Sequence, residues 1–135
     1  MIVIDASAAV RTVIDPETPF RAMLNAVELV IAPELIVAEI VSAFRKYVRA
    51  KMLTRSQADK SIKQALALID QLQPLRELVP DVLALGARTD SSAHDLFYLA
   101  LAQRTGATLL TADLALGRLA QTLGLSVATE REPAP

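Results

Sequence analysis

The chain has 135 residues, a formal net charge of −1 and no cysteine. The length matches one compact domain, and the charge excludes a protein that binds nucleic acid through bulk positive charge. The missing cysteines exclude disulfide bonds, thiolate metal sites and cysteine nucleophiles. A cysteine-free chain also fits a reducing compartment, and we expect a cytoplasmic protein.

The apolar content is 53%, slightly above that of an ordinary soluble protein, which indicates a core plus a protein interface. No apolar run approaches the roughly 18 residues that a membrane-spanning helix needs. The first residues are apolar with an acid at position 5, whereas a signal peptide starts with basic residues. We therefore expect no membrane segment.

The first half of the chain alternates apolar runs with amphipathic segments. The predicted elements are a strand over residues 1–4, a helix to about residue 13, a helix over 20–28, a strand over 29–32 and a helix over 34–51. The first helix can be capped by Asp5 or by Ser7. Pro33 suits the first turn of the helix that follows it.

The second half continues this alternation. The predicted elements are helices over 54–72, 81–88, 92–104 and 114–123, strands over 107–110 and 125–128, and a weak strand over 75–78. Pro80 is expected to begin the helix over 81–88. Gly106 is expected to end the helix over 92–104. The last residues, 129–135, hold two prolines and three charged residues and are predicted to fray.

Strands that alternate with helices predict an α/β fold with three layers. We expect one domain over residues 1–128, with a central, mostly parallel sheet of four to five strands between two layers of helices. In open sheets of this kind, ligands bind beyond the carboxyl ends of the strands.

Four carboxylates stand where such a fold would bring them together. They are Asp5, Glu39, Asp95 and Asp113. Three are expected at strand–helix junctions, and Glu39 lies at the flank of the apolar face of the helix over 34–51. Each has an ordinary alternative: Asp5 and Asp113 can cap helices, Ser92 and Asp95 nearly match a capping box, and Glu39 can be a half-solvated surface residue. The hypothesis therefore rests on the set.

Oxygen ligands without cysteine or paired histidine favour Mg²⁺ or Mn²⁺ over Zn²⁺. Carboxylates that are buried close together repel one another, and a bound dication reverses this cost. Such an ion can activate water and stabilise the leaving oxygen of a phosphodiester. The four acids therefore predict metal-dependent phosphodiester cleavage.

Two other polar features give weaker evidence of function. His94 is the only histidine and has no serine or cysteine partner in a recognisable triad, so we assign it no catalytic role. The densest basic stretch includes Arg45, Lys46 and Arg49. It is either a solvated helix face or a track that contacts the phosphate backbone of RNA.

Four segments carry a resemblance to a known family. They are IVIDAS (residues 2–7), APEL (32–35) before Glu39, HDLFYLALA (94–102) and LLTAD (109–113). In their order and spacing the chain resembles PIN-domain ribonucleases, most closely the VapC-type toxins of bacterial toxin–antitoxin systems. The resemblance extends over essentially the whole chain, to about residue 127.

The resemblance implies a PIN-like fold and an Mg²⁺- or Mn²⁺-dependent endoribonuclease. The family's acidic quartet falls on Asp5, Glu39, Asp95 and Asp113, as catalytic residues and metal ligands, with Ser7 and Thr111 as polar supports beside it. The resemblance also implies a homodimer and a cognate antitoxin, part of which covers the acidic cleft. Residues 114–116 are apolar where the family often carries a basic or aromatic residue.

Two alternatives stay open. One is an interaction module that keeps the PIN-like fold without activity. The other is a small Mg²⁺-dependent phosphatase, although a haloacid-dehalogenase-type site needs Asp-x-Asp after the first strand, and Ser7 stands at the second of those places. The chain shows no glycine-rich phosphate loop.

Overall fold

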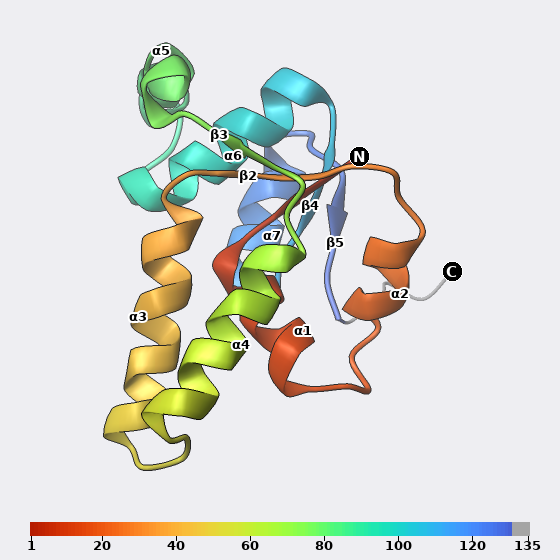
Figure 1. The fold of residues 1–135 in the computed structure, drawn as a ribbon. Coiled ribbons are helices and arrows are strands. Elements are labelled where there is room, and N and C mark those ends of the chain that lie inside the picture. The colour runs from red at the N-terminus through yellow and green to blue at the C-terminus, as the bar shows by residue number, and fades with distance from the viewer. Residues whose placement is uncertain (131–135) are drawn as a thin grey trace.

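A parallel sheet forms the centre of the computed structural model, which describes residues 1–130 (Figure 1). Its strands are β1 (Ile2–Ile4), β2 (Val30–Pro33), β3 (Gln71–Gln73), β4 (Thr108–Leu110) and β5 (Val127–Ala128). Their order across the sheet is β3-β2-β1-β4-β5, and every pair of neighbours is parallel. The α/β prediction with a parallel sheet is confirmed.

Helices cover the sheet and complete the three layers. They are α1 (Ala6–Ile14), α2 (Phe20–Asn25), α3 (Ile36–Arg49), α4 (Arg55–Ala67), α5 (Leu75–Gly86), α6 (Ala93–Thr105) and α7 (Leu114–Thr122). Helices α1, α3 and α4 pack against one another, whereas α6 packs across β1, β2 and β4 and also contacts α5 (Figure 1).

The central strand β1 sets the level of the functional edge. Its three residues are all buried, as expected for a strand covered on both faces. Ile4 is in register with Leu110 of β4. Because both strands run in the same direction, the next residue of each, Asp5 and Thr111, leaves the sheet at the same level.

The prediction for residues 68–88 is wrong in its boundaries. Helix α4 ends at Ala67, the strand lies at Gln71–Gln73, and residues 75–86 form α5 with Pro80 inside it. Asp70 draws this segment onto β2, because its carboxylate accepts from the Val30 N–H at 2.8 Å. Pro80 removes one helical hydrogen bond, and the burial of Leu78, Val82 and Leu85 against the core offsets that loss.

Two residues of the predicted tail belong to the described part of the chain. The carboxylate of Glu130 pairs with the Arg11 guanidinium at 3.0 Å and accepts from the Thr18 hydroxyl at 3.4 Å. Thr129 packs close to Gly117 of α7. The remaining residues of the predicted tail, 131–135, lie outside the described residues.

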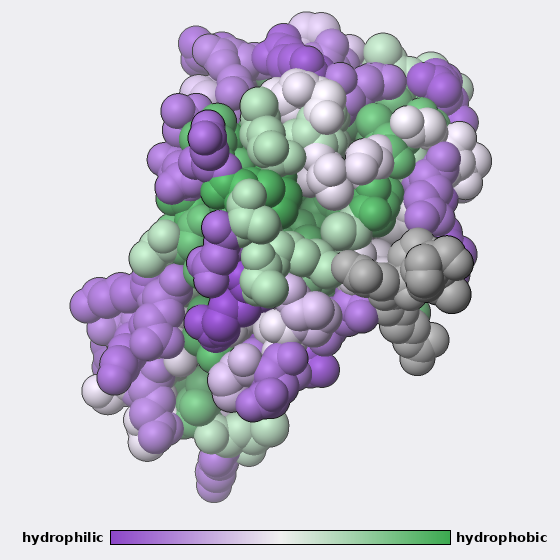
Figure 2. Space-filling view, turned by 90° about the vertical axis from the view of Figure 1, so that its right-hand side faces the viewer, coloured by the Kyte–Doolittle hydropathy of each residue, from purple (hydrophilic) through white to green (hydrophobic). Residues whose placement is uncertain are grey.

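Figure 2 shows the face on which β5 and α2 lie, with hydrophobic residues gathered at its centre and hydrophilic residues around them. The edge strand on this side is only two residues long, which limits pairing with strands of other molecules. Within residues 1–130, no helix is long and apolar enough to cross a membrane.

Candidate active site

Asp5 is the buried centre of the site, with a relative exposure of 5%. It follows β1 and caps α1, so the sequence alternative in which Ser7 takes the capping role is wrong. One carboxylate oxygen accepts from the Ala8 N–H at 2.9 Å and from the Ser7 hydroxyl at 2.7 Å. The other accepts from the Thr111 hydroxyl. Both oxygens are therefore held by the protein.

Burial raises the pKa of Asp5 from 3.8 to about 6. The hydrogen bonds from Thr111, Ser7 and Ala8 oppose this rise, and the negative charge of Asp113 adds to it. The carboxylate is thus ionised at neutral pH at a cost in free energy. Asp5 and Asp113 lie in one electrostatic environment, as the sequence hypothesis requires for this pair.

Asp113 stands at the carboxyl end of β4 and is exposed. Its carboxylate caps α7 by accepting from the N–H groups of Ala115 and Leu116 at 3.0 and 3.2 Å. Its own N–H donates to the Thr111 hydroxyl at 3.0 Å. Helix capping and a place beside Asp5 therefore coexist in this residue.

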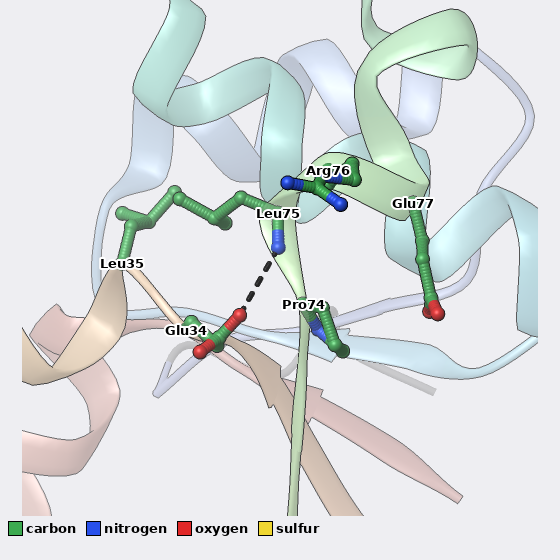
Figure 3. A pocket seen from close by; sticks show the side chains of 6 residues that line it. All are labelled: Glu34, Leu35, Pro74, Leu75, Arg76 and Glu77. Atoms are coloured by element: carbon green, nitrogen blue, oxygen red, sulfur yellow. Dashed lines mark hydrogen bonds between the residues drawn. The ribbon is translucent and has the colours of Figure 1, made fainter.

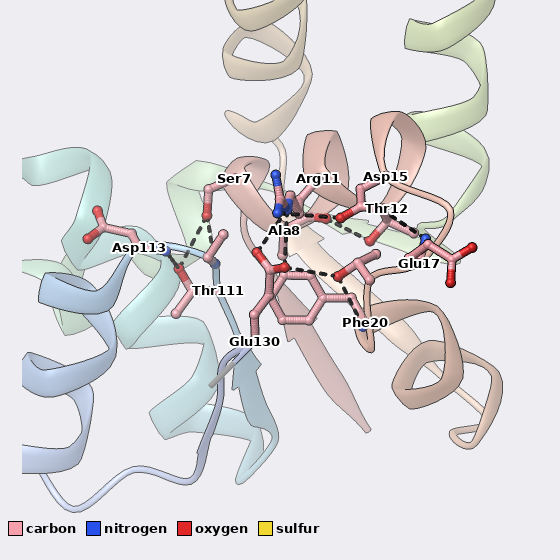
Figure 4. A network of polar contacts seen from close by, with 12 residues as sticks. Ser7, Ala8, Arg11, Thr12, Asp15, Glu17, Phe20, Thr111, Asp113 and Glu130 are labelled. Carbon is pink, nitrogen blue, oxygen red and sulfur yellow. Dashed lines mark hydrogen bonds and ion pairs between the residues drawn. The ribbon is translucent and has the colours of Figure 1, made fainter. Parts of the chain in front are cut away.

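Ser7 and Thr111 tie the two strand–helix junctions together (Figure 4). Their hydroxyl oxygens are 3.3 Å apart, and the Ser7 hydroxyl also accepts from the Ala112 N–H at 3.0 Å. Thr111 is fully buried. Since both hydroxyls donate to Asp5, they fix its carboxylate between β1 and β4.

Glu39 reaches the site from α3 with a side chain that is 28% exposed. The Tyr98 hydroxyl donates to one of its carboxylate oxygens at 2.5 Å, and His94 Nδ1 lies 3.7 Å from the other. Burial raises the pKa of Tyr98, and the charges of Glu39 and Asp5 raise it further. Tyr98 therefore stands in the field of both acids.

Asp95 lies in the first turn of α6, which follows α5, so the expectation that a strand precedes it is wrong. Its N–H donates to the Ser92 hydroxyl at 3.2 Å, and its carboxylate accepts from the Ser91 hydroxyl at 3.3 Å. Over residues 1–130, no hydrogen bond or ion pair joins Asp95 to the other three acids.

The four acids do not form a closed metal site in the described part of the chain. Among residues 1–130, no group of three or more His, Cys, Asp or Glu side chains is arranged to hold a metal ion. The donor chemistry nevertheless fits a hard dication, because the quartet offers only carboxylate oxygens. A cation would also stabilise the buried negative charge of Asp5.

The sequence prediction missed the contacts that α6 makes with Glu39. His94 was assigned no role, and its side chain is indeed 73% exposed, yet it faces Glu39. Tyr98 belongs to an apolar run that indicates core, and the sequence left a surface position open for Tyr98 itself, whereas its relative exposure is 2%. The available signal was spacing, because residues four apart on a helix share a face, and His94 and Tyr98 stand four apart at the start of α6.

The three basic residues of α3 do not share one surface hollow. Lys46 lines a hollow of about 350 Å³ together with Glu39 and His94. Arg45 lines a separate hollow between α3 and α4, and Arg49 is exposed at the end of α3. Of the three, Lys46 is the one that borders a hollow shared with a member of the quartet.

A larger hollow, of about 500 Å³, lies at the carboxyl ends of β2 and β3 (Figure 3). Glu34, Arg76 and Glu77 contribute its charged groups. The Glu34 carboxylate accepts from the Leu75 N–H at 3.3 Å and so caps α5 from another segment. This hollow contains none of the predicted site residues.

Comparison with known proteins agrees with this fold. The model of the family described as "PIN domain" matches residues 2–121, and the chain belongs to the PIN-domain family. Within it, the chain is 30% identical over 121 residues to Ribonuclease VapC9 of Mycobacterium tuberculosis, a match that covers 90% of this chain and 92% of the relative.

Solved structures share the fold at lower identity. PAE2754 from Pyrobaculum aerophilum has a TM-score of 0.68 and 23% identity, with 93% of this chain and 87% of that chain covered. VapBC2 from Rickettsia felis, solved bound to a DNA fragment from its promoter, has a TM-score of 0.64 and 15% identity, with 96% and 98% covered.

Proposed function

We propose that the chain is a VapC-type endoribonuclease that cleaves RNA at the carboxyl edge of β1 and β4. Its family and its similarity to VapC ribonucleases support this activity. The observation that carries the location is Asp5, a buried carboxylate beside the charge of Asp113 at this edge. An ionised acid in such an environment is a common feature of functional sites.

The proposed catalytic residues are Asp5, Glu39, Asp95 and Asp113, which would together hold Mg²⁺ or Mn²⁺. When bound, the dication supplies a more acidic water and stabilises the leaving oxygen. Ser7 and Thr111 support the site by fixing the Asp5 carboxylate. Lys46, which borders the hollow of Glu39, is proposed to contact the RNA backbone with Arg45 and Arg49.

Metal removal and loss of one acid test this function. We expect the purified chain to cleave RNA with Mg²⁺ or Mn²⁺ and to stop in EDTA. Asp95→Asn should cleave at least about 100-fold more slowly, because it removes a charge from the quartet. Asp59→Asn is the matched control, since Asp59 is exposed on α4 and its ion pair with Lys63, at 3.1 Å, is exposed too. Cleavage that persists in EDTA would reject the metal mechanism, and full activity of Asp95→Asn would remove Asp95 from it.

The proposed protein partner is a cognate antitoxin. Support comes from the structural similarity to VapBC2 of Rickettsia felis and from the acids at the edge of the sheet. A basic segment is the chemistry that would complement these acids. Such a pair would act in the cytoplasm, where RNA is available. The chain has no cysteine and so needs no disulfide bonds, which fits this reducing compartment.

The homodimer is proposed to form through an exposed apolar face of α5. Val79 and Leu83 are exposed there by 43% and 71%. Val79 and Leu83 stand four residues apart on α5 and so share a face. A self-complementary apolar face of this kind is what a two-fold dimer buries.

Leu83→Glu is expected to convert the dimer to a monomer, because a two-fold axis brings each new charge into an apolar interface. Sedimentation velocity at several protein concentrations measures this change. Met52→Glu is the control, since Met52 is 67% exposed on another surface. A Leu83→Glu chain that dimerises like the unmodified protein would place the interface elsewhere.

A further inference from the structure

Tyr98 is a buried phenol within the apolar run of α6, residues 96–102. Its relative exposure is 2%, and its neighbours Leu96, Leu99 and Ala100 on α6 are buried with it. A buried hydroxyl costs free energy unless it is hydrogen bonded. Phenylalanine would fill the same space without that cost. The hydroxyl therefore needs an explanation beyond packing.

The partner of this hydroxyl is the carboxylate of Glu39, at 2.5 Å. A donor bonded to a carboxylate makes a stronger bond than one bonded to a neutral acceptor. His94, one turn earlier on α6, lies 3.7 Å from the second oxygen of the same carboxylate. Among the described residues, only the Tyr98 hydroxyl lies within hydrogen-bond distance of this carboxylate, and the bond is partly buried.

We propose that Tyr98 is a positioning residue for RNA cleavage, whose hydroxyl holds the Glu39 carboxylate in its working orientation. This inference rests on the proposed function and deepens it. Because Tyr98 is buried, it acts through Glu39 and does not touch the substrate. Its removal should change the rate of the chemical step and leave RNA binding almost unchanged.

Tyr98→Phe removes the hydroxyl and keeps the ring. We expect kcat to fall by about 10- to 100-fold, the range for a charged hydrogen bond or a misplaced catalytic group, with KM for RNA within about twofold. Tyr47→Phe is the matched control, because Tyr47 is the only other tyrosine, and it should cleave normally. A Tyr98→Phe chain that cleaves as fast as the unmodified protein would overturn the proposal.

A double-mutant cycle separates positioning from a general structural effect. If Tyr98 acts through Glu39, Tyr98→Phe should cause no further loss in a Glu39→Gln background. The same loss in both backgrounds would overturn the proposal. If Glu39→Gln alone cleaves normally, Glu39 has no role, and the positioning role falls with it.

Binding of Mn²⁺ by calorimetry gives a readout that does not depend on cleavage. We expect Tyr98→Phe to weaken Mn²⁺ binding by roughly 10-fold, as loss of a group that orients a metal ligand does, and Tyr47→Phe to leave it unchanged. Equal binding by Tyr98→Phe and the unmodified chain would contradict the proposed role of Tyr98. Absence of RNA cleavage by the unmodified chain would instead reject the ribonuclease function.

Discussion

Asp5→Asn is expected to abolish RNA cleavage and at the same time to stabilise the fold. Cleavage should fall by about 10³-fold, beyond the roughly 10- to 100-fold loss caused by groups that only support a metal ligand. Asparagine keeps the size of the side chain and its capacity to cap α1. It removes the charge whose burial raises the pKa of Asp5 to about 6.

The gain in stability depends on pH in a defined direction. Above pH 6 the carboxyl is ionised in the folded and unfolded states, so the folded state bears the full cost of the buried charge. Well below pH 3.8 both states are protonated and the cost disappears, and most of it is already gone at pH 4. A pKa raised from 3.8 to about 6 corresponds to roughly 3 kcal/mol, which is the upper limit of the gain at pH 8.

Urea unfolding of both chains at pH 4 and pH 8, with EDTA present, measures this difference in the free energy of unfolding. The control is Asp59→Asn, which removes an exposed charge and should change stability by less than about 0.5 kcal/mol. If Asp5→Asn is less stable than the unmodified chain at pH 8, the hydrogen bonds to the Asp5 carboxylate outweigh the cost of burying its charge.

Thr111→Val should have the opposite effect on stability. It removes a buried hydroxyl that donates to the Asp5 carboxylate and accepts from the Asp113 N–H at 3.0 Å. Loss of a hydrogen bond to a buried charged group should destabilise the fold by about 2–3 kcal/mol at pH 8. Because the bond from Thr111 lowers the pKa of Asp5, its loss raises that pKa further.

The penalty of Thr111→Val should therefore grow as the pH rises from 4 to above 6, where the Asp5 carboxylate carries its charge. Chemical unfolding at several pH values measures the slope. Thr108→Val is the control in the same strand, since the Thr108 hydroxyl lies in an exposed pair with Ser126 at 2.9 Å. A penalty that is equal at pH 4 and pH 8 would mean that Thr111 acts only by packing.

The strands at the centre of the sheet could be predicted from the sequence, whereas the β3 edge could not. Strands β1 and β4 are short apolar runs because helices cover both of their faces. Strand β3, Gln71–Gln73, is polar and largely exposed, so it carries no hydrophobic signal. Pro80 was misleading because the start of α5 is fixed by a long-range bond from Leu75 to Glu34.

The acids of the candidate site also differ in how well the sequence predicts their positions. The nearness of Asp5 and Asp113 could be predicted because Asp5 directly follows β1, Asp113 comes three residues after β4, and neighbouring strands of a parallel sheet end at one edge. Asp95 and Glu39 lie on helices, where the sequence gives the face but not the partner. Tyr98 shows this limit, because an apolar run conceals the one hydroxyl that reaches Glu39.

The bond between Thr111 and Asp5 joins residues 106 positions apart, and this separation has a consequence during synthesis. When the ribosome has made β1, β2 and β3, strand β1 has β2 on one side but still lacks β4 on the other. At roughly 5–20 residues per second, that neighbour emerges several seconds after the first strand. A nascent chain of this protein should therefore lack the contact between Asp5 and Thr111 until β4 has been made, and ribosome-bound fragments that end before residue 107 should be protease-sensitive and should not cleave RNA.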